Sequence, residues 1–166
     1  MNAQQANNPD MQSTNAVPRA LLLFLRFHLA VILLLTVTGK IVREAPFRVE
    51  MLDFVGHVMG RTIPPYHAFL QNVVIPHATL FSYLVMIAEL VAGVLLLTGT
   101  CTRAGAAITM FLVLNFMLAK GRWFWSPDNV DAADFFSALV VMLGAAGRAW
   151  GVDALLAKRW PRSWLW

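Results

Sequence analysis

The sequence predicts an all-α integral membrane protein, a four-transmembrane-helix bundle with an amphipathic helix in the loop between spans one and two. The first observation is composition: of 166 residues, 58% are hydrophobic and 13% charged, and mean hydropathy is +0.62. A soluble domain usually carries about 25% charged residues. The second is a set of four apolar runs. Because a backbone in lipid must satisfy its own hydrogen bonds, such runs form helices rather than strands.

The chain divides into three parts. Residues 1–18 are polar, offer little surface to bury, and are expected to form a disordered tail. Residues 19–157 form the predicted membrane domain. Residues 158–166 combine basic residues with Trp160, Trp164 and Trp166, a composition typical of a membrane interface.

The predicted spans cover residues 20–39, 79–98, 104–119 and 133–147. A helix that crosses a core of about 30 Å needs about 20 residues. The third span is therefore expected to extend towards Arg103 and Lys120, and the fourth through Trp150 to Leu156. Only residues 99–103 join the second and third spans, so these two must form an antiparallel hairpin.

The long loop after the first span contains a helical pattern of its own. Its apolar residues recur at helical spacing, with charged residues between them: Phe47, Met51, Phe54, Val55 and Val58. This pattern predicts an amphipathic helix that lies on the membrane or caps the bundle. A second short helix is expected over residues 66–75.

Two ionisable residues of opposite charge lie inside the predicted spans, Arg26 in the first and Glu89 in the second. Each costs roughly 2.5–3.5 kcal/mol on membrane insertion scales, so we expect them to pack together. Counting residues at 1.5 Å each places them at similar depths, about 9 Å and 14 Å from one face. Tyr83 and Asn115 could complete a polar site around them. A structural ion pair and a site for a quinone head group, an anion or a proton both stay open.

Several kinds of chemistry find no motif in the sequence. The single cysteine, Cys101, excludes an internal disulfide and a CxxC redox pair. The histidines show no HxxxH or CxxCH spacing, so no metal or haem is expected. No basic helix or aromatic-basic module predicts nucleic-acid binding. We therefore expect no intrinsic cofactor, and a quinone is the one candidate ligand. The lipid bilayer is the first expected partner.

The numbers of basic residues on the two sides of the membrane are equal, so they do not indicate the orientation. The side with the termini and the side with the long loops carry six Lys or Arg each: Arg19, Arg103, Arg148, Lys158, Arg159 and Arg162 against Lys40, Arg43, Arg48, Arg61, Lys120 and Arg122. The positive-inside rule therefore gives no decision. Acidic residues gather on the second side, which favours both termini in the cytoplasm.

Several short motifs, in order, resemble the DoxX/DoxD family of small four-span membrane proteins between residues 19 and 156. They are Leu25-Arg26, Gly39-Lys40, Ala88-Glu-Leu-Val-Ala-Gly-Val-Leu-Leu-Leu-Thr-Gly-Thr-Cys-Thr-Arg103 and Gly147-Arg-Ala-Trp-Gly-Val-Asp-Ala-Leu-Leu156. The resemblance implies a polar signature of Arg26, Lys40, Glu89, Arg103, Arg148 and Asp153. The Thr-Cys-Thr-Arg stretch departs from the family's usual leucine-rich turn.

The resemblance implies two functions of different classes. DoxD-type members are similar to the small subunit of a thiosulfate:quinone oxidoreductase, which suggests a subunit of a membrane redox complex near the quinone pool. The alternative is a non-catalytic structural or assembly subunit of a larger membrane complex. Either role places the chain in a bacterial cytoplasmic membrane among other subunits. A small transporter has little support, because no clear inverted repeat is visible.

Overall fold

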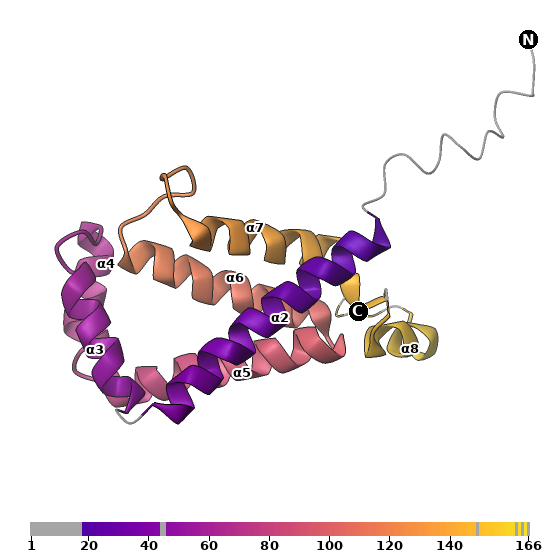
Figure 1. The fold of residues 1–166 in the computed structure, drawn as a ribbon, viewed down its shortest axis with the longest axis horizontal. Helices are drawn as coiled ribbons and strands as arrows, with labels where there is room; N and C mark the ends of the chain where they lie inside the picture. Colours follow the sequence, from indigo (N-terminus) through magenta and orange to yellow (C-terminus); the bar gives the residue numbers. More distant parts are fainter. Residues whose placement is uncertain (1–17, 44–45, 149, 162, 164, 166) are drawn as a thin grey trace, which may run out of the picture.

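The computed structural model describes residues 18–43, 46–148, 150–161, 163 and 165. Within these residues the chain is helical and has no strand, so the predicted all-α class is confirmed (Figure 1). The tail predicted for residues 1–18 lies outside this part of the chain, except for Pro18. So do Trp164 and Trp166 of the predicted C-terminal tail.

Three helices of the described chain are long and apolar enough to cross a membrane. They are α2 (Arg19–Val42), α5 (Ala78–Thr98) and α6 (Thr102–Ala119). Gly99 ends α5 in the left-handed conformation, with φ +67°, and the chain turns at once into α6. The predicted hairpin of the second and third spans is therefore confirmed.

The fourth predicted span is shorter than expected. Helix α7 (Val130–Leu143) has 14 residues, or about 21 Å at 1.5 Å per residue. Its extension to Leu156 is wrong, because Ala145 and Trp150 have positive φ values of 47° and 63°. The chain instead forms a short 3-10 turn, η3 (Ala146–Arg148), and a separate helix α8 (Val152–Arg159). These turns direct α8 back to the hairpin, a tertiary contact that the apolar pattern does not encode.

The long helices pack through small residues. Helix α2 lies against α5 and α7, and α6 lies between α5 and α7. The shared core contains fully buried alanines from four helices: Ala30, Ala92, Ala106 and Ala138. A Cβ atom on Gly93 would come within 2.9 Å of Leu34. Small side chains let helices approach closely in lipid, so the bundle rests on backbone proximity as well as on apolar contact.

The loop helices cap one end of the bundle. They are α3 (Phe47–Val58), α4 (Pro64–Phe69) and a π-helical turn η2 (Leu70–Val74), grouped beyond the ends of α5 and α6 (Figure 1). Met51, Val55, Leu70 and Val74 are buried in one cluster. The amphipathic helix and the second short helix predicted for this loop are both confirmed.

A glycine fits the cap against the bundle. Gly121 follows α6 with φ +62°, and a Cβ atom at this position would collide with the carbonyl oxygen of Arg61. Nearby, the Thr62 hydroxyl donates to the Ala119 carbonyl over 2.6 Å. The cap is thus attached to the end of α6 by the Thr62 side chain and by a close backbone approach that needs glycine at position 121.

Candidate functional site

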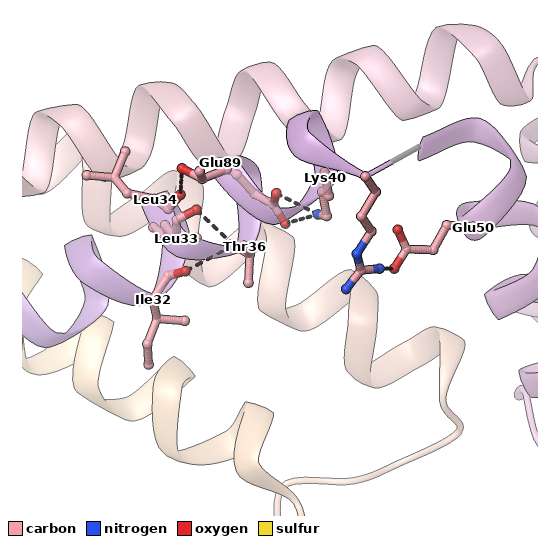
Figure 2. Close-up of polar contacts among 9 residues, drawn as sticks. Ile32, Leu33, Leu34, Thr36, Lys40, Glu50 and Glu89 are labelled. Atoms are coloured by element: carbon pink, nitrogen blue, oxygen red, sulfur yellow. Dashed lines mark hydrogen bonds and ion pairs between the residues drawn. The ribbon is translucent and has the colours of Figure 1, made fainter. Parts of the chain in front are cut away.

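The most buried carboxylate of the apolar spans is paired with a lysine. The Lys40 ammonium lies 2.6 Å from both carboxylate oxygens of Glu89, so it binds them in a bidentate manner (Figure 2). Glu89 is 3% exposed, and the Lys40 side chain 14%. The ammonium also lies 4.4 Å from the centre of the Phe47 ring at the start of the cap. The pair therefore joins α2, α5 and α3.

The predicted contact between Arg26 and Glu89 is wrong. The Arg26 guanidinium lies beside Gly99, where a Cβ atom would be 2.7 Å from Nη1. Gly99 is ten residues, or about 15 Å, along the chain from Glu89. Counting depth from span ends assumes that neighbouring helices start level and run parallel to the membrane normal. In the structure α2 crosses α5 obliquely, which brings Lys40 to Glu89 instead (Figure 1).

Arg26 takes part in a second polar cluster at the opposite end of the bundle. The side chain is 1% exposed and donates to the carbonyl oxygens of Ala146 and Trp150, each over 3.1 Å. These carbonyls belong to the turn between α7 and α8. Arg26 thus binds the segment that diverts the chain away from a longer fourth span.

Asp153 completes this cluster. Its carboxylate accepts hydrogen bonds from the backbone N–H groups of Cys101 and Thr102, over 2.6 Å and 2.9 Å, at the start of α6. Its own N–H donates to the Gly99 carbonyl at the end of α5. The first N–H groups of a helix have no partner within the helix. A carboxylate at this position satisfies them, and its negative charge interacts favourably with the positive end of the helix dipole. Asp153 therefore caps the hairpin from α8, a role the sequence did not reveal.

Tyr83 and Asn115 do not join either cluster. Tyr83 is 60% exposed on α5. The Asn115 side-chain oxygen accepts a hydrogen bond of 2.9 Å from the Tyr66 hydroxyl in the cap. Burial raises the pKa of Tyr66, which keeps this hydroxyl protonated as the donor. The four residues predicted as one polar site therefore lie in four separate places in the structure.

A further set of charges links α7 to its neighbours. Lys120 lies 2.7 Å from Asp131, and His28 lies 3.9 Å from Asp134. From the sequence, the acidic residues of this loop were considered only as charges on one side of the membrane. The sequence feature that could have indicated these contacts is the position of Asp131 and Asp134 in the first turns of an apolar helix. Within the described residues, no three His, Cys, Asp or Glu side chains are grouped to hold a metal ion.

The remaining signature residues lie near the second cluster. Arg103 follows Thr102 in the first turn of α6, and Arg148 ends η3. Four of the six signature residues, Arg26, Arg103, Arg148 and Asp153, therefore belong to the end where α5, α6, η3 and α8 meet. The other two, Lys40 and Glu89, form the buried pair.

Comparison with known families supports the resemblance drawn from the sequence. The family model described as DoxX matches residues 21–121, which is more than half of the chain. The chain belongs to the DoxX family. Members of this family are small membrane proteins, so the apolar helices are those of a membrane protein. No curated protein and no solved structure matched the chain.

The DoxX match includes only part of the polar framework. Residues 21–121 contain Arg26, Lys40, Glu89 and Arg103, together with the cap and the α5–α6 hairpin. Arg148 and Asp153 lie beyond the matched range. Both residues of the Glu89–Lys40 pair thus lie in the DoxX-matched region. Asp153, which binds the first N–H groups of α6, lies outside it.

Proposed function

We propose that this DoxX protein is a non-catalytic structural subunit of a larger membrane complex. The observation that carries the proposal is the bidentate contact of Lys40 with Glu89. Both carboxylate oxygens are engaged, so a substrate would have to compete with the partly buried Lys40 ammonium for them. The same holds at the other end, where Arg26 and Asp153 bind backbone groups. The buried charges thus connect helices.

The outer face of the hairpin suits a partner helix. An open groove of about 550 Å³ runs between α5 and α6. Its lining residues are all apolar: Leu84, Ile87, Ala88, Val91, Ala107, Ile108 and Phe111. Small residues at a lipid-facing groove allow another helix to approach closely. The groove lies on the face of α5 away from Glu89, so partner binding and the ion pair can be altered separately.

The test is retention of partners by a groove variant. The full chain would be tagged, extracted gently from its native membranes and sized by native electrophoresis. We expect Ala107→Phe, which fills the groove, to lose the co-purifying subunits without a change in thermal stability. Val31→Phe, an exposed position on α2, is the matched control and should retain them. Migration of the wild-type chain at its own mass would contradict the proposal.

A redox subunit near the quinone pool is the second candidate. It is favoured by the location of the Glu89–Lys40 pair beside Phe47, where an acid, an ammonium and an aromatic ring meet under the cap. Thiosulfate-dependent quinone reduction would be measured in membranes with the amount of complex normalised. A loss of turnover in Glu89→Gln at unchanged complex content would favour this candidate. A loss proportional to the complex content would favour the structural role.

A further inference from the structure

The C-terminal helix α8 exposes an unusual combination of side chains. Trp150 before the helix is 86% exposed and Trp160 after it 53%, and Leu155 between them is 66% exposed. Lys158 and Arg159 of the last turn are exposed as well. The Arg159 guanidinium lies 5.5 Å from the Trp160 ring. A short helix with exposed apolar and basic residues, flanked by exposed tryptophans, is typical of a segment that lies in a membrane interface.

The position of α8 fits such a surface. The helix lies beyond the ends of α5 and α6, at the end of the bundle opposite the cap (Figure 1). It is held there by Asp153, whose carboxylate binds the start of α6. This attachment holds the exposed residues next to the ends of α5 and α6.

The charges at the two ends of the bundle are compensated differently. At the cap end, Lys40 pairs with Glu89, Arg43 with Glu50, and Lys120 with Asp131. At the α8 end, Asp153 is the one side-chain carboxylate among the described residues, and it is 1% exposed and bound to backbone N–H groups. The two sides carry equal numbers of basic residues but differ in pairing, because Lys158 and Arg159 form no ion pair with a side-chain carboxylate within the part of the chain that the structure describes.

We propose that α8 is an interfacial anchor that binds anionic lipid headgroups through Lys158 and Arg159. Trp150, Leu155 and Trp160 insert between the lipids, and the two cations meet the headgroup phosphates. Charge complementarity favours anionic lipid as the partner. A zwitterionic surface offers little attraction to two adjacent cations, whereas an anionic leaflet attracts each one. This proposal does not depend on the function proposed above.

The test is a lipid titration of the purified full chain in neutral detergent, followed by native mass spectrometry. Phosphatidylglycerol is the anionic probe and phosphatidylcholine the neutral one. Each basic residue near an anionic surface contributes about a fivefold gain in affinity. The double variant K158Q/R159Q should therefore bind phosphatidylglycerol about 25-fold more weakly, with phosphatidylcholine binding unchanged. Higher salt should reduce the difference, because these charges are exposed.

The matched control is R48Q/R61Q, which removes two exposed cations from the cap end. It should leave the phosphatidylglycerol titration within twofold of the wild type. An equal loss in both double variants would mean that total charge, and not α8, governs binding, and would overturn the proposal. Unchanged binding by K158Q/R159Q would overturn it as well. Because all four side chains are exposed, the variants are expected to fold, and thermal unfolding of each checks this.

Discussion

Glu89 and Lys40 show how a single charge in an apolar helix is tolerated. An unpaired charge in hydrocarbon is costly, and breaking a buried pair by removing one partner costs about 3–5 kcal/mol in proteins. Replacing both partners by apolar residues of similar volume is often neutral. Lys40 lies near the end of α2 and its side chain is 14% exposed, so it can partly reach water when Glu89 is absent. The cost of losing Glu89 should therefore lie below that range.

We expect Glu89→Gln to lower the free energy of unfolding by about 2 kcal/mol, because a charge-assisted hydrogen bond is lost and Lys40 keeps its charge. The double variant K40M/E89L should recover most of this loss. Thermal unfolding in one detergent measures both. Glu50→Gln, which breaks an exposed ion pair with Arg43, is the control and should cost less than about 1 kcal/mol. A double variant less stable than Glu89→Gln would refute the pairing argument.

At the scale of elements, helix α8 acts on helices that are distant in sequence. Asp153 binds the N–H groups that begin α6 and, through its own N–H, the carbonyl that ends α5. Gly99 makes the turn possible, since it adopts φ +67° and leaves room for the Arg26 guanidinium. Asp153 of α8 thus satisfies backbone groups at the end of α5 and at the start of α6. These contacts explain why the chain turns back to the hairpin and does not continue as one longer fourth helix.

Asp153→Ala should destabilise the protein by about 2–3 kcal/mol, because the two charge-assisted hydrogen bonds that cap α6 are lost. Hydrogen exchange should increase in the first turn of α6 and in α8, while α3 in the cap stays protected. Asp53→Ala, an exposed residue of α3 with a contact to His57, is the control and should change stability by less than about 0.5 kcal/mol. Uniform loss of protection across all helices would contradict a local capping role.

At the scale of the whole molecule, the two ends of the bundle differ in chemistry. One end is covered by α3, α4 and η2 (Figure 1) and pairs three of its cations, Lys40, Arg43 and Lys120, with acids. The other end presents α8 with exposed cations and tryptophans. Cytoplasmic leaflets are the more anionic ones and cytoplasmic segments carry excess Lys and Arg. This asymmetry favours the α8 end on the cytoplasmic side.

A reporter fused after Trp166 tests this orientation. A green fluorescent fusion should be fluorescent in cells, and a fusion to a phosphatase that folds only outside the cytoplasm should be inactive. Inserting the phosphatase after Trp125, in the exposed loop before α7, should give the opposite result if α6 spans the membrane. An active C-terminal phosphatase fusion would place α8 on the outer side.

The sequence by itself determined the class of the fold and most of its elements. Composition excluded a soluble domain, helical spacing of Phe47, Met51 and Val55 placed the cap helix, and the five residues after Thr98 required the hairpin. These features are local: they depend on the period of apolar residues and on the length of a loop. The motifs around Glu89 likewise indicated the family before any contact was known.

Only the tertiary structure decided which charges meet. Lys40 and Glu89 are 49 residues apart, and Asp153 and Cys101 are 52 apart. Their contacts depend on the angle at which α2 crosses α5 and on the turns that bring α8 back to the hairpin. Apolar periodicity specifies which face of a helix is buried, but not its crossing angle or its register against a neighbour. Arg26 was therefore recognised as a buried charge from the sequence and given its partners only by the fold.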